Sequence, residues 1–507
     1  MFVGTASDVG KSVITTGFCR ILLQDGYRPA PFKAQNMSLN SYVTPEGLEI
    51  GRAQAVQAEA AGIPCNSDMN PVLLKPTGDM HAQLVLHGRP AGNQSAYDYF
   101  MGEDKAALWE EVKCAFDRLA KQYNPVVLEG AGSISELNLK RRDITNMRMA
   151  LHAQADVYLI ADIDRGGVFA SVYGTLALLP PEERALIRGV IINKFRGDGR
   201  LFENGKQQLE SLTGIPVTGV LPFFRDIHIE EEDSVALRHR PKEHKPGAVN
   251  VAVVHLPHLA NFTDFAALER SGLHVYYTDD AVELGQAAII ILPGSKNTIG
   301  DLLYIRERGL DRAIVAAEAA GVVVVGICGG YQIMGLTVAD PYGVEGEPRT
   351  VEGLGLLPVH TVLSKEKTTV RRRMRYGSTD GPVLEGYEIH MGHTDTGEQP
   401  RKPLNYPLSG GHGRRWEEGG GHPGEAADGY RGEAADGYRL SAKCWGTYLH
   451  GILDNRVVME DLLRQAGVEH APLPDYRAFK ERQYDKLAEH LRQHLDILSI
   501  YKQLAKK

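Results

Sequence analysis

Residues 322 to 335, VVVVGICGGYQIMG, carry the pattern that decides the fold of this chain. Four consecutive valines predict a buried strand of the kind found in parallel sheets that are covered on both faces. Gly326-Ile327-Cys328-Gly329-Gly330 follows, and residues 331–334 have the character of a first helical turn. A strand, a sharp turn and a helix, with a nucleophile at the apex of the turn, make up a nucleophile elbow, here with sulfur in place of oxygen.

The cysteine at the apex of this elbow is a candidate nucleophile. Side chains larger than hydrogen beside Cys328 would collide with the strand and the helix, so the glycines around it have a physical reason. The dipole of the helix favours a thiolate at its N-terminus, and the backbone N–H of Gly329 is placed to stabilise an oxyanion. A buried structural cysteine is the common alternative beside a run of valines. The four glycines between 321 and 330 favour the nucleophile.

Composition limits the class of protein. A length of 507 residues predicts two or three domains. The hydrophobic fraction of 43% is that of an ordinary globular protein, and the net charge of −8 argues against a general nucleic-acid or membrane-surface binder. The five cysteines form no CxxC pair, which argues against a disulfide framework and a zinc site and fits a reducing compartment. Without an apolar run of membrane-spanning length or a signal peptide, we expect a cytoplasmic protein.

A glycine-rich loop, GTASDVGKS, follows a predicted strand of three residues and precedes a predicted helix over 13–23. In such a loop the backbone N–H groups cradle phosphates, the lysine reaches the β and γ oxygens, and the serine hydroxyl can ligate Mg²⁺. A solvated glycine turn is the alternative, which the Lys-Ser pair at the end of the loop disfavours. The residues expected to bind the nucleotide here are Gly4, Thr5, Asp8, Gly10, Lys11 and Ser12. The short strand favours a natural start that lies upstream.

Three charged residues in the first half are further candidates. Lys33 ends a short strand and is a second cation that could lie near a transferring phosphoryl group, although a surface lysine is the commoner explanation. Glu129 ends the strand 125–128, where Mg²⁺ coordination in a nucleotide site needs a carboxylate; a surface acid is the alternative. Asp68 is either a metal or substrate ligand or a turn residue before Pro71.

The first half alternates between strands and helices. Apolar strands at 156–164 and 189–194 flank a helical stretch at 167–179. This alternation predicts a parallel sheet with right-handed crossovers over residues 1–230. Ligands of open parallel sheets gather at the carboxyl ends of the strands, so we expect Asn193, at such an end, to face the nucleotide or the acceptor.

The second half opens another α/β domain. A charged linker is predicted over 231–247, and the domain itself over 248–455. The backbone N–H next to Gly294, at the tip of the strand 287–292, is a candidate second oxyanion donor. His450 follows the strand 444–449 and is the natural general base for Cys328, with a structural histidine as the alternative.

Two segments of the second half lie outside this pattern. Residues 401–439 are poor in aliphatic side chains and contain GEAADGYR twice in tandem, which predicts an exposed insertion without a packed role. Residues 456–507 predict charged amphipathic helices packed on the rim. His390 and His393 form an H-x-x-H pair, but no further ligands stand at a convincing spacing, so we expect a substrate-facing or packing role.

Longer motifs carry a family resemblance over nearly the whole chain, apart from the insertion. GICGGYQIMG, PGSKNT and YLHG resemble the class I glutamine amidotransferase domain of the cobalamin pathway. GTASDVGKS is typical of the P-loop branch that resembles dethiobiotin synthetase, and FKAQNMSLNSYVT, DMNPVLLKPT, LEGAGSISELNL and DIDRGGVFAS resemble the cobyric acid synthase family. Many class I relatives carry a catalytic acid two residues after the histidine. Here that residue is Ile452, so we expect a Cys328–His450 dyad; nothing in the sequence places the nearby Asp454 against His450.

The resemblance implies an ATP- and glutamine-dependent amidation of the b, d, e and g carboxylates of a corrin, (adenosyl)cobyrinic acid a,c-diamide. ATP with Mg²⁺ would activate the carboxylate as an acyl phosphate, and L-glutamine would supply the ammonia. A related P-loop amidotransferase, acting on the a and c carboxylates or on a cell-wall lipid, is one alternative. A switch ATPase that binds a partner is another, but it would leave the cysteine elbow without a purpose.

Overall fold

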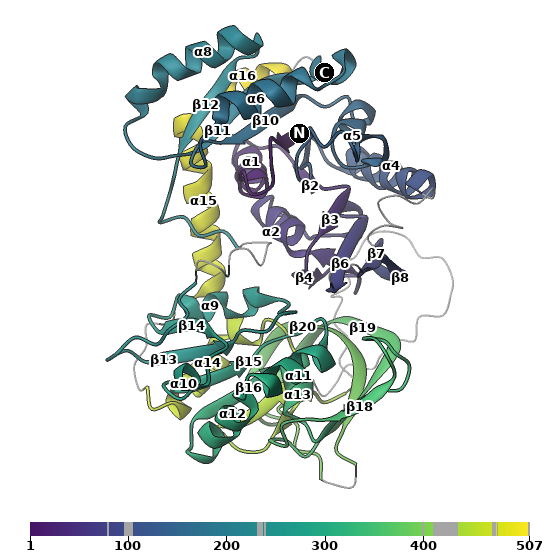
Figure 1. Cartoon of the computed structure of the whole chain (residues 1–507), viewed down its shortest axis with the longest axis vertical. Coiled ribbons are helices and arrows are strands. Elements are labelled where there is room, and N and C mark those ends of the chain that lie inside the picture. The colour runs from purple at the N-terminus through teal and green to yellow at the C-terminus, as the bar shows by residue number, and fades with distance from the viewer. Residues whose placement is uncertain are drawn as a thin grey trace.

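The computed structural model describes residues 1–78, 81–95, 105–230, 237, 240–397, 400–408, 434–468, 473 and 475–504. Within them the chain forms two α/β units, which lie one above the other along the long axis in Figure 1. The first unit runs from β1 to β12 and the second from β13 to β23. Most of the predicted insertion, including the first copy of its repeat, lies outside the described residues. Its described ends contradict the prediction of a segment without a packed role, because Asn405, Asp436 and Tyr438 are buried and residues 405–407 and 438–439 pair with other strands.

The core of the first unit is a parallel sheet, as its apolar strands predict. β1 (Phe2–Gly4), β10 (Val157–Asp162), β11 (Ile187–Phe195) and β12 (Val217–Pro222) pair in this order. β2 (Ala30–Phe32) pairs in parallel with β9 (Val126–Leu128), and a bridge from Phe2 to Glu129 joins this pair to β1. The loop after β1 and the carboxylate after β9 therefore meet at one end of the sheet.

Alternate residues of the sheet face two separate hydrophobic cores. Tyr158 and Ile160 pack with α1 (Lys11–Gln24) on one face, whereas Val157 and Leu159 pack with the helices of the other face. The sheet is thus covered on both sides, which explains why its strands are apolar throughout. The other helices of this unit are α2 (Arg52–Ala60), α4 (Lys105–Gln122), α5 (Met147–His152), α6 (Val168–Ala177), α7 (Pro181–Arg184) and α8 (Glu203–Thr213).

A smaller sheet of the first unit points toward the second unit (Figure 1). It contains β3 (Gln35–Met37), β6 (Val72–Gly78), β7 (His81–Leu86) and β8 (Arg89–Ser95) in this order. The hairpin of β4 (Ser41–Val43) and β5 (Glu49–Gly51) follows β3 in the chain.

The second unit has the predicted α/β architecture, and the valine run lies inside its sheet. The strand order is β14 (His274–Thr278), β13 (Asn250–Val254), β15 (Ile289–Leu292), β16 (Val323–Ile327) and β23 (Cys444–Thr447), all parallel, with β22 (Tyr438–Arg439) antiparallel at the edge. A second sheet holds β17 (Thr337–Asp340), β18 (Arg349–Glu352), β19 (His360–Tyr376), β20 (Val383–Asp395) and β21 (Asn405–Pro407). The helices of this unit are α9 (Ala266–Glu269), α10 (Ala281–Leu284), α11 (Thr298–Glu307), α12 (Leu310–Ala319) and α13 (Gly329–Met334).

The C-terminal helices do not form a rim, contrary to the prediction from their charge pattern. α14 (Arg456–Gln465) packs into the core of the second unit. α15 (Tyr476–His494) and α16 (Ile497–Leu504) return to the first unit, and α15 runs beside it in Figure 1. A Cβ atom at Gly17 of α1 would approach Leu487 Cγ to 3.0 Å, so this glycine allows the close contact between α1 and α15.

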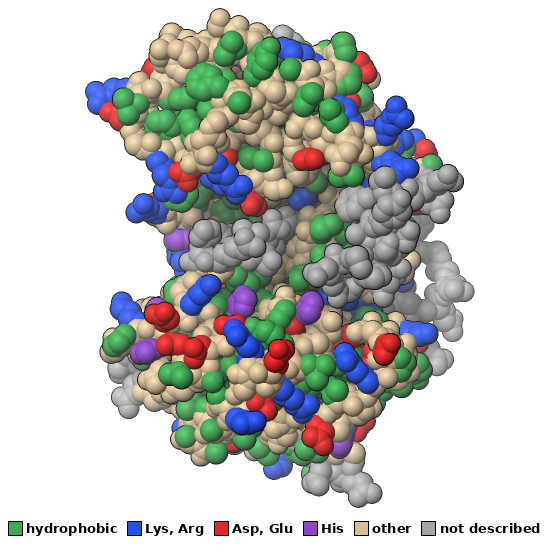
Figure 2. All heavy atoms as spheres, viewed as in Figure 1, with side chains coloured by type: hydrophobic (Ala, Val, Ile, Leu, Met, Phe, Trp, Pro, Cys, Tyr) green, Lys and Arg blue, Asp and Glu red, His purple; other side chains and the backbone are tan. Residues whose placement is uncertain are grey.

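The surface is mixed in charge. On the face seen in Figure 2, Lys and Arg side chains of the second unit are interspersed with Asp and Glu. Among the described helices, none combines the length and the apolar character needed to cross a bilayer.

Candidate active site

The cysteine elbow joins β16 to α13. Cys328 has φ 53° and ψ −109°, a strained conformation at the turn, and it is buried. Its N–H donates to Thr447 O at 2.8 Å, which ties the elbow to β23. A Cβ atom at Gly329 would lie 2.7 Å from Ser295 N, and one at Gly326 would lie 2.6 Å from Met334 Sδ. The glycines therefore let the strand and the helix approach closely enough to hold the thiol at the apex.

His450 follows β23 and is almost fully buried beside the elbow. Its Nδ1 lies 2.7 Å from Asp264 Oδ2, and Gly451 N–H donates to Asp264 Oδ1 at 2.9 Å. Burial opposes protonation of the ring, but the Asp264 carboxylate and Cys328 together raise the pKa of His450 to about 10. The side chains thus form the series Cys328, His450 and Asp264, in which the carboxylate orients the imidazole.

Asp264 was missed in the sequence, where we expected a dyad. It lies on the 3-10 helix Phe262–Phe265, beyond the carboxyl end of β13, and this side of the parallel sheet is the one signal that could have pointed to it. Asp454, the acid nearest to His450 in sequence, is exposed at the end of the 3-10 turn Ile452–Asp454. The residue two positions after the histidine, Ile452, packs into the hydrophobic core.

Asp264→Asn keeps the shape of the side chain and removes its charge. We expect glutamine hydrolysis to slow by roughly 10²–10⁴-fold, because a neutral amide neither fixes the tautomer nor stabilises the imidazolium. In the wild type, the Asp264 carboxylate raises the pKa of His450. Loss of the carboxylate lowers the pKa of His450, so the alkaline limb of the kcat/KM profile should move to lower pH. A profile identical to that of the wild type would contradict this role of Asp264.

The predicted oxyanion donors lie near the thiol. Gly294, Ser295, Cys328 and His450 line one cavity with a volume of about 710 Å³. The carbonyl oxygen of Gly294 accepts a hydrogen bond from Ala260 N–H at 2.9 Å, which fixes the peptide at this strand tip. The N–H groups of the strand tip remain the candidate oxyanion donors. His390 lines the same cavity, and its ring stacks on that of Tyr448 with the ring centroids 3.7 Å apart. Among the described residues, no group of three or more His, Cys, Asp or Glu could hold a metal ion.

The glycine-rich loop connects β1 to α1 in the first unit. Gly10 has φ 100°, a conformation that favours glycine, and α1 starts at Lys11. Lys11 Nζ donates to Ala6 O at 3.1 Å and to Gly132 O at 2.9 Å, so the ammonium lies between two loops. This arrangement places a cation and the N-terminus of a helix at the same point, which suits phosphate.

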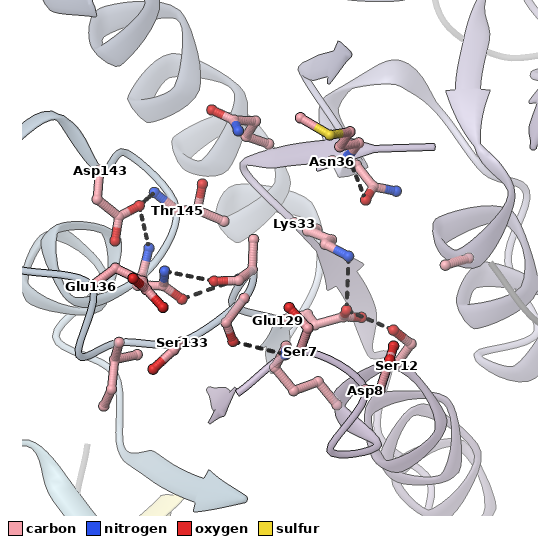
Figure 3. A pocket seen from close by; sticks show the side chains of 18 of the residues that line it. Ser7, Asp8, Ser12, Lys33, Asn36, Glu129, Ser133, Glu136, Asp143 and Thr145 are labelled. Carbon is pink, nitrogen blue, oxygen red and sulfur yellow. Dashed lines mark hydrogen bonds and ion pairs between the residues drawn. The ribbon is translucent and has the colours of Figure 1, made fainter. Parts of the chain in front are cut away.

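Glu129 is the centre of the polar contacts in this cavity (Figure 3). Its carboxylate accepts from Ser12 Oγ at 2.8 Å and from Gln57 Nε2 at 2.6 Å, and it pairs with Lys33 Nζ at 3.0 Å. Burial would raise the pKa of Glu129, but Lys33 and these two donors hold it below its usual range. An ionised carboxylate beside a serine hydroxyl offers two oxygen ligands of the kind that Mg²⁺ takes together with phosphates and waters.

The remaining predicted residues differ in position. Asp8 has φ 58° and lines the cavity, whereas Asn193 supports the loop from behind by donating to Val9 O at 2.8 Å. The structure does not bring Asp68 to Glu129: its carboxylate pairs with Arg118 at 2.6 Å, and it is not among the residues that line the cavity. The sequence around Asp68, shortly before Pro71, is the same whether the aspartate is a ligand or a turn residue, so the sequence could not separate the two roles.

The cavity around Lys11 and Glu129 has a volume of about 740 Å³. Besides the phosphate loop it is lined by the segment 131–148, which contributes several cations. Those cations are Lys140, Arg142 and Arg148, and Lys105 and Arg165 stand at the same cavity. The cavity therefore offers several cations to an anionic ligand such as a nucleotide.

Comparisons with known proteins find relatives for both halves of the chain. Residues 1–235 match the CobQ/CobB/MinD/ParA nucleotide binding domain, and residues 250–458 match the CobB/CobQ-like glutamine amidotransferase domain. The chain is 57% identical to a cobyric acid synthase of Bacteroides fragilis over 99% of this chain and 97% of that protein. It is 54% identical to the cobyric acid synthase of Phocaeicola vulgatus and 46% identical to that of Klebsiella pneumoniae, with the same coverage of 99% and 97%. The chain therefore belongs to the cobyric acid synthase family.

Proposed function

We propose that this chain amidates the b, d, e and g carboxylates of (adenosyl)cobyrinic acid a,c-diamide to give (adenosyl)cobyric acid, with ATP and glutamine as co-substrates. One observation carries the proposal: a single chain holds a Cys328–His450–Asp264 series in one unit and a phosphate loop with Glu129 in the other. A glutaminase alone needs no phosphate loop. An ATPase alone needs no nucleophilic cysteine.

The first unit would activate the carboxylate. A carboxylate oxygen attacks the γ-phosphorus of ATP, the bond to the β-phosphate oxygen breaks, and an acyl phosphate and ADP result. Lys11 and Lys33 are the cations that would neutralise the transferring phosphoryl group. Ser12 and Glu129 would hold Mg²⁺, which when bound offsets the phosphate charge and orients the phosphates. Asp68 takes no part, since Arg118 holds its carboxylate.

The second unit would release ammonia. Cys328 Sγ attacks the side-chain carbonyl carbon of glutamine, and N–H groups at residues 294–295 and 329 would stabilise the oxyanion. The imidazolium of His450 gives its proton to the departing amide nitrogen, and water then cleaves the thioester to glutamate. The ammonia attacks the acyl phosphate in the first unit, which forms the amide and releases inorganic phosphate.

The proposed domain limits separate the carboxylate-activating unit from the ammonia-releasing unit. We place the amidoligase domain at 1–230, the linker at 231–247 and the glutaminase domain at 248–455. The C-terminal extension, 456–507, includes α15 and α16, which complete the core of the amidoligase domain. The five free cysteines suit a reducing compartment, so we infer a cytoplasmic location. We infer no nucleic-acid or membrane partner.

Mass spectrometry of the corrinoid product tests this function. With cobyrinic acid a,c-diamide, ATP, Mg²⁺ and glutamine, we expect a product with an amide at each of the b, d, e and g positions and release of glutamate and phosphate. Cobyrinic acid without amides and a cell-wall lipid acceptor are the control substrates. Amidation confined to the a and c positions, or confined to the lipid, would overturn the proposal.

A further inference from the structure

One segment of the first unit reaches from the nucleotide cavity to the glutaminase histidine. It starts at Lys33 and Asn36, which line the cavity around Glu129. It continues through a turn, in which Asn40 N–H donates to Ser38 Oγ at 2.9 Å, to Ser41 at the start of β4. β4 contacts β20 of the second unit. The segment 33–43 is therefore a physical connection between the two sites.

Two buried hydrogen bonds join this segment to the loop after β13. Ser41 N–H donates to Asn261 Oδ1 at 2.8 Å, and Phe262 N–H donates to Asn40 Oδ1 at 3.0 Å. Ser41 is itself fixed, because its Oγ accepts from Lys75 Nζ at 2.9 Å and its carbonyl accepts from Tyr387 Oη at 3.2 Å. Ser41 is thus held by Lys75 of its own unit and by Tyr387 of the second unit.

The bond from Ser41 determines which way the Asn261 amide faces. Since Oδ1 accepts from Ser41 N–H, the Nδ2 group must point the other way, and it lies 3.2 Å from His450 Nε2 and 3.5 Å from His450 Nδ1. A nitrogen that is nearly equidistant from both ring nitrogens lies over the ring face, because in the ring plane it would collide with Cε1. The amide therefore covers a face of the imidazole.

Two kinds of contact hold the plane of the His450 ring. The bond from Nδ1 to Asp264 Oδ2 restrains rotation of the ring about its Cβ–Cγ bond, and contacts to the ring face restrain it further. The ring of Tyr387 lies at 22° to the imidazole with the centroids 5.4 Å apart, and the Asn261 amide adds a polar contact to the ring face. Asn261 has φ 54° and ψ 42°, a left-handed conformation that asparagine tolerates better than most residues.

We propose that Asn261 is a positioning residue for His450, and that it is held in place by Asn40 and Ser41 of the other unit. The glutaminase histidine is then aligned with Cys328 only while the two units are docked through this contact. The inference rests on the proposed function, because it assigns to His450 the proton transfer of glutamine hydrolysis. The titratable groups that face His450 are Asp264, Cys328 and Tyr387.

Asn261→Gly removes the amide and keeps the left-handed backbone, since glycine adopts it without strain. We expect kcat for glutamine hydrolysis to fall on the order of tenfold to a hundredfold, while KM for glutamine stays within about threefold of the wild type, because misalignment affects proton transfer and not binding. Ammonia-dependent amidation should be unchanged and serves as the folding control. An unchanged kcat, or a loss confined to KM, would overturn the proposal.

The partner on the first unit supplies a matched pair of variants. Asn40→Asp keeps an oxygen acceptor for Phe262 N–H and should retain the glutaminase kcat, whereas Asn40→Leu removes the acceptor and should lower it. The double variant of Asn40→Leu with Asn261→Gly should be no slower than Asn261→Gly alone. Additive losses would show two independent effects and would overturn the proposal. Glutamate release needs no corrinoid, so a wild type that hydrolyses glutamine without amidating the corrinoid would refute the proposed function and leave this test intact.

Discussion

Cys328→Ala is expected to abolish glutamine-dependent amidation, with a loss of roughly 10⁴-fold or more, because the variant lacks the thiol that would form the thioester with glutamine. Amidation with ammonium salts should continue at the wild-type rate. The thiol lies at the apex of the elbow and lines the cavity of the second unit, whereas the acyl phosphate would form in the cavity of the first. The measurement is amide formation on the corrinoid with glutamine and with ammonium chloride at elevated pH.

Cys114→Ser is the matched control for this variant, since Cys114 is exposed on α4 and far from the elbow in sequence. It should behave as the wild type with both nitrogen donors. Trapping with an electrophilic glutamine analogue should label the wild type and Cys114→Ser and leave Cys328→Ala unlabelled. Loss of the ammonia-dependent reaction in Cys328→Ala would contradict the separation into two sites.

Lys11→Ala is expected to remove both the glutamine- and the ammonia-dependent amidation, by about 10³-fold or more, because the Lys11 ammonium stands at the end of the phosphate loop, where it would meet the phosphates of ATP. In the structure its Nζ is held between the carbonyls of Ala6 and Gly132, at the start of α1. Without it, the transferring phosphoryl group would lose one of the two cations, Lys11 and Lys33, that would neutralise its charge. The thioester on Cys328 should still form.

Exposed Lys121, near the end of α4, supplies the matched control, and Lys121→Ala should retain both activities. The two readouts for Lys11→Ala are phosphate release in the presence of ammonium and labelling of Cys328 by the glutamine analogue. Ammonia-dependent turnover that survives in Lys11→Ala would refute the role of the phosphate loop. Loss of labelling would instead indicate that the second unit no longer folds.

Features that depend on a few consecutive residues were predictable. The phosphate loop needs a glycine with positive φ at position 10 and a helix that begins at Lys11, and both requirements can be read locally. The elbow needs glycines that let β16 and α13 approach each other, and the spacing of the glycines around Cys328 predicts this turn. The apolar strands of both sheets were predictable for a similar reason, since a strand that is buried on both faces has few polar residues.

Features that depend on contacts between distant segments were not predictable. Asp264 and His450 are 186 residues apart, and no spacing rule connects them. The charge pattern of α15 shows that one face is apolar but not which surface it covers, and the structure places it against α1. The sequence offered both Asp68 and Glu129 as metal ligands. Only the tertiary structure shows that Asp68 pairs with Arg118, whereas Glu129 accepts a hydrogen bond from Ser12.

The sequence by itself therefore determined the α/β fold class, the glycine-rich loop before α1, the tight turn that carries Cys328 and the family, because backbone geometry and hydrophobic periodicity are local properties. The tertiary structure alone decided the acid that orients His450, the packing of the C-terminal helices and the contact of Asn261 with Ser41. Each of these arises when a side chain meets a partner brought to it by the sheet topology. Periodicity predicts that an element forms, but the partner of each side chain is decided when the elements pack.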